Sequence, residues 1–94
     1  MIRKPYVAGQ FYPSEREQLR ETVAALVDPE ASPQKAIAVV SPHAGYVYSG
    51  RVAAAVFSSV NIPGTCVILG PSHRGIDPLF AIQVRGRWAT IIFW

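Results

Sequence analysis

The sequence predicts an α/β domain in which a βαβ unit forms part of a larger parallel or mixed sheet. Two continuous apolar runs, at 36–40 and 66–69, have the length and β-branched content of strands buried on both faces of a parallel sheet. A helix between them, capped by Ser49 and ending at about Val60, would make the crossover, which is expected to be right-handed. The 94 residues allow a single domain.

Composition excludes several other classes of protein. The chain is 50% hydrophobic and 16% charged, which rules out intrinsic disorder and indicates more apolar surface than so short a chain can bury. No segment approaches the ~20 apolar residues of a membrane span, and no apolar segment that would make a signal peptide follows the N-terminus. The basic residues are scattered, with a net charge of +3, and Cys66 is the single cysteine. We therefore expect a cytoplasmic protein with neither nucleic-acid nor membrane partners.

Other elements follow from periodicity and turn chemistry. Ser14 and Glu17 form a capping box that opens a helix, and Asp28-Pro29 ends it. The second helix is apolar nearly all round and should be buried. Residues 79–84 are predicted to form a third strand, and residues 88–94 a fourth.

Two histidines, His43 and His73, each follow a predicted strand in a proline-containing turn. Each is followed by x-Gly, and Gly45 and Gly75 permit backbone geometry that would strain other residues. Loops after neighbouring parallel strands leave the same edge of a sheet, where ligands bind in open α/β folds. Two imidazoles there can meet one metal ion at ~2.0–2.2 Å each. From spacing alone, a metal site and a pair of ordinary surface histidines are equally good interpretations.

A third ligand is harder to find. Catalytic zinc usually takes three protein ligands, and non-haem iron takes two histidines and a carboxylate. Asp77 is the acid nearest to His73 along the chain, although loop aspartates usually cap turns. Cys66 begins its strand ~13 Å from the loop edge, so we expect it in the core. Within this chain the predicted site is incomplete.

Two neighbours of the histidines are weaker candidates. The phenol of Tyr46 either donates a hydrogen bond to a bound substrate or water, or packs in the core with a wet hydroxyl. Arg74 either attracts an anionic substrate or remains a solvated side chain, and we favour the solvated side chain.

Three segments of the chain carry a family resemblance. Residues 42–50 read Pro-His-Ala-Gly-Tyr-Val-Tyr-Ser-Gly, residues 68–73 read Ile-Leu-Gly-Pro-Ser-His, and residues 3–13 contain an Ala-Gly-x-aromatic-Tyr pattern. Together they resemble the Memo family, whose bacterial and archaeal members are also called AmmeMemoRadiSam system protein B. The resemblance implies an α/β fold similar to that of the class III extradiol ring-cleaving dioxygenases, which use non-haem iron.

The resemblance also implies a site and partners. His43 and His73 correspond to metal-binding positions, with an iron or copper ion, and the third ligand lies downstream in sequence that this chain lacks. A radical SAM enzyme and an AMMECR-type protein are implied as protein partners. Residues 1–94 then form a single, incomplete Memo-like domain. Because the family pattern after Thr90 would continue Pro-Leu-Gly, whereas this chain ends in four apolar residues, our hypothesis is an N-terminal fragment.

Three functions remain open. The first is a Memo-like protein that carries two histidines of a non-haem iron or copper site, related in form to the extradiol dioxygenases. Whether it catalyses a reaction stays open, since a fold does not confer an activity. The second is a non-catalytic module that binds a protein or peptide. The third is a truncated product without independent function, whose exposed sheet edge and apolar tail favour aggregation.

Overall fold

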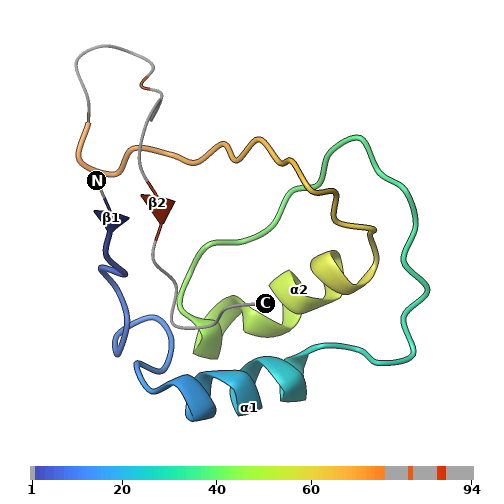
Figure 1. Ribbon diagram of the computed structural model, residues 1–94, viewed down its shortest axis with the longest axis horizontal. Helices are drawn as coiled ribbons and strands as arrows, with labels where there is room; N and C mark the ends of the chain where they lie inside the picture. The colour runs from blue at the N-terminus through green and yellow to red at the C-terminus, as the bar shows by residue number, and fades with distance from the viewer. Residues whose placement is uncertain (1, 76–80, 82–86, 89–94) are drawn as a thin grey trace.

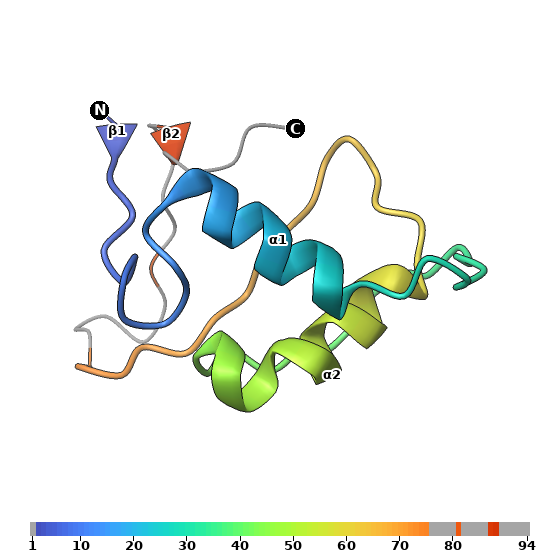
Figure 2. The same ribbon diagram turned by 90° about the horizontal axis from the view of Figure 1, so that it is seen from below.

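The structure contains two helices and two very short strands. This computed structural model describes residues 2–75, 81 and 87–88. The elements in chain order are β1 (Ile2–Arg3), α1 (Arg16–Leu26), α2 (Tyr46–Ser58) and β2 (Arg87–Trp88). The two helices lie side by side, and long extended segments run beside them (Figure 1; Figure 2). Both helices expected from the sequence are therefore present.

The first helix starts one residue later than its predicted cap. Glu15 is the N-cap residue and makes no side-chain capping bond, so the predicted capping box does not form. Ser14 instead lies beside the preceding turn, where a Cβ built on Gly9 would be 3.6 Å from the Cβ of Ser14. The helix ends at Leu26, close to the predicted Asp28-Pro29 boundary. Leu19, with 5% exposure, is the one buried hydrophobic side chain among the described residues.

The second helix begins three residues before its predicted cap. Gly45 is the N-cap residue, and Ser49 lies inside the first turn. The Ser49 hydroxyl donates to the carbonyl of Ala44 at 3.1 Å, because a serine inside a helix can bond back to a carbonyl of the preceding turn. The prediction that Ser49 caps this helix was therefore wrong. Its hydroxyl donates to a backbone carbonyl, whereas a capping hydroxyl accepts from a backbone N–H.

Close packing joins α1 to α2 through a glycine. Gly50 is buried, and a Cβ built on it would lie 2.9 Å from Cδ1 of Leu26. The backbone N–H of Asp28 also donates to the hydroxyl of Ser58 at 3.3 Å. The rest of α2 is less covered than its composition predicted, since Phe57 is 49% exposed. The expectation that α2 is buried was wrong. Nearly every face of α2 is apolar, but α1 covers only one of these faces in the described structure.

The two apolar runs that flank α2 are extended but form no strand in the described part of the chain. Ile37 is 107% exposed and Ile68 is 90% exposed, so the predicted burial is not seen. A strand needs a neighbour for its N–H and C=O groups. In the described part of the chain, the segments that lead into these runs pair at one place, before either run begins. That place is an isolated parallel bridge between Gln34 and Val60. There the N–H of Gln34 donates to Ser59 at 2.9 Å, and the N–H of Asn61 donates back to Gln34 at 2.9 Å.

The ends of the chain pair with each other. β1 and β2 form a parallel two-stranded sheet in which Ile2 pairs with Arg87 and Arg3 pairs with Trp88. The predicted third strand, apart from Ala81, lies outside the described residues, as does the predicted fourth strand beyond Trp88. Neither described helix is long and apolar enough to cross a membrane.

Candidate functional site: a pair of facing imidazoles

The structure brings His43 and His73 together. Their Nε2 atoms are 3.1 Å apart, and their ring centroids are 5.2 Å apart with the planes tilted by 42°. His43 lies in the loop before α2, and His73 follows the second apolar run. Both residues are exposed, so solvent or a ligand can reach the two nitrogens. Residues 30 positions apart thus meet through their distal ring atoms.

The backbone beside each histidine is held in a different way. After His73 the chain turns at Gly75, whose φ of +70° lies in the left-handed region that glycine reaches without strain. After His43 the chain enters α2 at Gly45, whose φ of −57° any residue can adopt. The two glycines were expected to serve the same purpose, and that is wrong for Gly45. A Cβ built on Gly45 would make an ordinary van der Waals contact, 3.5 Å from the carbonyl oxygen of Phe11.

The spacing of the two nitrogens fits one metal ion. Metal–nitrogen bonds of ~2.0–2.1 Å place neighbouring ligand atoms about 2.9 Å apart in an octahedron and about 3.4 Å apart in a tetrahedron. The observed 3.1 Å lies between these two values. The same spacing fits a hydrogen bond between neutral rings, in which the Nε2–H of one imidazole donates to the bare Nε2 of the other. The 3.1 Å spacing is therefore compatible with a shared proton and with a shared metal ion.

A complete metal centre is not assembled from the described residues. No group of three His, Cys, Asp or Glu side chains comes together in this part of the chain. Asp77, the acid suggested by its closeness to His73, lies outside the described residues. Cys66 is exposed, which contradicts the expectation that it packs in a core, because its run lacks a covering layer. The described residues bring together two imidazole nitrogens and no third group of this kind.

Tyr46 and Arg74 have separate surroundings. Tyr46 is the first residue of α2, and its ring lies 5.6 Å from the ring of Tyr12, tilted by 41°. Tyr46 is 36% exposed, so it is not a core residue, and its place in substrate binding stays a prediction. Arg74 is exposed in the turn beside His73, in keeping with the solvated side chain that we favoured.

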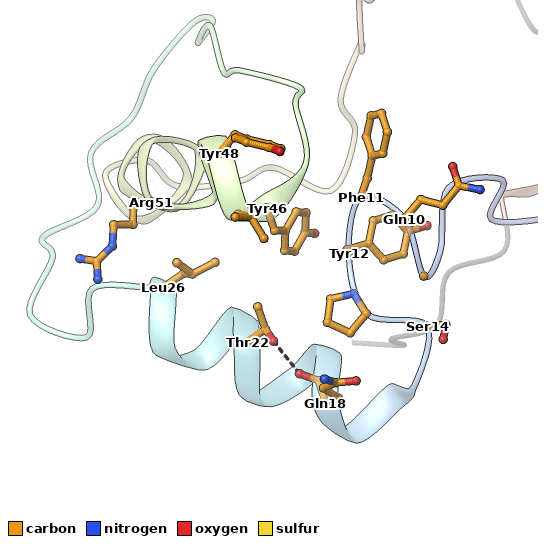
Figure 3. A pocket seen from close by; sticks show the side chains of 13 residues that line it. Gln10, Phe11, Tyr12, Ser14, Gln18, Thr22, Leu26, Tyr46, Tyr48 and Arg51 are labelled. Carbon is orange, nitrogen blue, oxygen red and sulfur yellow. Dashed lines mark hydrogen bonds between the residues drawn. The ribbon is translucent and has the colours of Figure 1, made fainter.

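A second concave region lies between the helices and the N-terminal segment (Figure 3). Its volume is about 660 Å³, and neither histidine lines it. The wall combines aromatic rings with polar groups from both helices, among them Phe11, Tyr12, Gln18, Thr22, Tyr46 and Arg51. Sequence reasoning missed this region. The sequence feature that could have indicated it is the aromatic pattern at 10–13. We used that pattern for the family resemblance and did not expect it to contact α2.

Comparison with known proteins decides the family. The family model described as Memo-like protein matches residues 3–92. The chain belongs to the Memo family.

Relatives from distant organisms agree with this assignment. The chain is 39% identical over 99 residues to a MEMO1 family protein of Nitrosopumilus maritimus, covering 96% of this chain and 36% of that protein. It is 38% identical over 90 residues to one of Aquifex aeolicus, covering 95% of this chain and 34% of that protein. A MEMO1 family protein of Thermotoga petrophila is 43% identical over 105 residues, covering 96% of this chain and 38% of that protein. No solved structure matches the chain.

The length of this Memo-family chain bears on its site. It spans a little more than a third of the curated relatives that it matches, about 36% in the Nitrosopumilus case. Both facing histidines lie within the matched residues 3–92.

Proposed function

We propose that this Memo-family chain supplies His43 and His73 as two ligands of a non-haem iron or copper ion. The observation that carries the proposal is the 3.1 Å separation of the two Nε2 atoms, which matches neighbouring ligand positions on one ion. Family membership is consistent with it, since the residues that resemble the family's metal-binding positions are those that meet. Iron or copper bound there would supply redox and Lewis-acid chemistry.

The chain's own residues have a defined part in this proposal. Each imidazole binds through Nε2, which requires that Nε2 carry no proton and that Nδ1 be the protonated nitrogen. The hydrogen-bonded proton between the rings must leave when an ion enters. The exposed position of both rings allows that exchange with solvent.

The proposal extends to the fold around the site. The runs at 36–40 and 66–69 would be neighbouring parallel strands of an extradiol dioxygenase-like sheet, in a cytoplasmic protein. Three observations support this arrangement. A parallel bridge joins Gln34, which precedes the first run, to Val60, which follows α2; the runs flank that helix, and the loops after them bring His43 and His73 together.

Metal analysis of matched variants tests the ligand assignment. The purified chain and its His43→Ala and His73→Ala variants are loaded with Fe(II) or Cu(I), desalted and analysed for bound metal. We expect the parent to retain the ion and each variant to lose most of it, because one imidazole is a weak ligand by itself. Arg74→Ala, which leaves both rings in place, is the control. Metal retained equally by both histidine variants would show that these residues are not the ligands.

A second candidate function is a binding module for proteins. The exposed apolar side chains of the two runs favour it, because contiguous apolar surface marks interaction sites. The proposed partners are a radical SAM enzyme and an AMMECR-type protein. If this role is independent of the ion, metal-free protein and the His43→Ala variant will bind a purified partner as well as the parent does. Binding that requires the ion would assign the partner to the metal-dependent form alone.

A further inference from the structure

We infer that the N-terminal hook, residues 7–13, positions His43 so that its ring can meet that of His73. This inference rests on the proposed function, because positioning matters where the two nitrogens share a ligand. The hook is remote in sequence from His43 but contacts the start of α2, two to three residues after that histidine. Figure 3 shows Tyr12 of the hook beside Tyr46 at the start of α2.

The hook holds its own shape through backbone hydrogen bonds. The N–H of Gly9 donates to the carbonyl of Tyr12 at 2.7 Å, and the N–H of Phe11 donates to that of Val7 at 2.9 Å. Gly9 has a φ of +80°, a left-handed conformation that strains a residue with a Cβ. These short-range bonds close the hook before it meets α2. It therefore presents a fixed surface to the helix.

The hook serves as the cap of α2. The first N–H groups of a helix have no acceptor within the helix. In α2, the N–H of Tyr46 donates to the carbonyl of Phe11 at 2.8 Å. No side chain caps this helix end, so a carbonyl from the hook takes that place. The rings of Tyr12 and Tyr46 add a contact at 5.6 Å, and Gly45 lies against the backbone of Phe11.

The cap is coupled to His43 through a very short segment. Ala44 and Gly45 alone separate the histidine from Tyr46, and the carbonyl of Ala44 is bonded to the hydroxyl of Ser49. The backbone after His43 is thus tied to α2, and α2 is tied to the hook. Because His43 itself is exposed, a layer of packed side chains does not hold its ring. The position of the ring follows the position of this backbone.

Nuclear magnetic resonance on the metal-free chain tests the inference directly. Protons on rings whose Nε2 atoms are 3.1 Å apart should give a nuclear Overhauser effect between His43 and His73. We expect Tyr12→Ala and Gly9→Ala to weaken that effect at least twofold while the helical circular dichroism is retained. Tyr12→Phe, which keeps the ring, should restore it. Tyr6→Ala, at an exposed tyrosine outside the hook, and Gly64→Ala, with open space around it, are the matched controls.

Metal affinity gives the second readout. Weakened positioning should lower the Fe(II) or Cu(I) affinity of the hook variants about tenfold, the lower end of the effect of groups that orient ligands. If the hook variants keep their helices, their ring contact and their affinity, the inference is wrong. If the parent shows the ring contact but binds no ion, the proposed function fails, while the positioning role is still decided by the Overhauser effect.

A further variant separates positioning from general folding. Should a hook substitution reduce the helical signal, Gly45→Leu acts at the junction alone, since its side chain would push against Phe11 while the hook keeps its own bonds. We expect this variant to lose the ring contact and to keep both helices. A Gly45→Leu protein with an unchanged contact between His43 and His73 would overturn the inference.

Discussion

The helical pair and the two apolar runs differ in how they satisfy their backbones, although both are rich in apolar residues. In α1 and α2 each interior N–H bonds within its own segment, so the helices form and then pack through Gly50 and Leu26. The runs at 36–40 and 66–69 contain no bridge themselves; a bridge joins Gln34 to Val60 before them, and His43 meets His73 after them. A helix can thus complete its hydrogen bonding with 11 or 13 residues, whereas a strand depends on a neighbour.

The helices and the runs also differ in how far their apolar side chains are buried. Apolar side chains in the helices and in the runs have similar hydrophobicity, yet Leu19 is 5% exposed and Leu69 is 91% exposed. The free energy available from burial is therefore realised at one leucine and not at the other. Substitutions at matched residues of the two regions measure that contrast.

The largest expected effect comes from the two leucines. Leu19→Ala should lower the free energy of unfolding by about 2–5 kcal/mol, because it removes buried methyl groups and leaves a cavity. Leu69→Ala should change it by less than about 0.5 kcal/mol, the usual effect of an exposed substitution. Urea unfolding followed by helical circular dichroism measures both. Equal destabilisation would mean that residue 69 is covered in solution, and the contrast between the regions would fail.

A smaller effect is expected from the contact between the helices. Gly50→Leu should cost about 1–2 kcal/mol, since overpacking costs about 1–3 kcal/mol and leucine regains ~0.8 kcal/mol of helix propensity over glycine. The cause is the 2.9 Å approach of a Cβ at residue 50 to Leu26. Gly64→Leu, with nothing within 4 Å, should be nearly neutral and is the control. An unchanged unfolding midpoint for Gly50→Leu would show that the helices do not pack as described.

The smallest effect concerns the turn after His73. Gly75→Ala should cost about 1 kcal/mol because its φ of +70° strains a residue with a Cβ. The strain is local, so the ring contact between His43 and His73 should weaken while helix content stays constant. Gly70→Ala, which meets nothing within 4 Å and has no left-handed φ, provides the comparison. The measurement is the nuclear Overhauser effect between His43 and His73. If both variants match the parent, the turn at Gly75 does not determine the position of the His73 ring.

Sequence reasoning found the elements with local signals and missed those with distant ones. The ends of α1 and α2 were predicted to within a few residues, although neither predicted serine caps its helix; the end of α1 lies close to the proline signal at Asp28-Pro29, which acts locally. The hook's bond to Tyr46 joins residues 35 positions apart (46 − 11), and no local pattern reports it. Cys66 was expected inside because its neighbours are apolar, but burial depends on a second layer that composition does not supply.

The sequence alone determined the family, the two helices and the choice of His43 and His73 as the residues to examine, since each depends on residue types and short spacings. Tertiary structure decided that the two Nε2 atoms lie 3.1 Å apart and that the hook caps α2. It also decided that Leu19 is buried while Leu69 is exposed. The physical reason is that a propensity or a cap acts within a few residues, whereas convergence and burial depend on which distant segments meet in space.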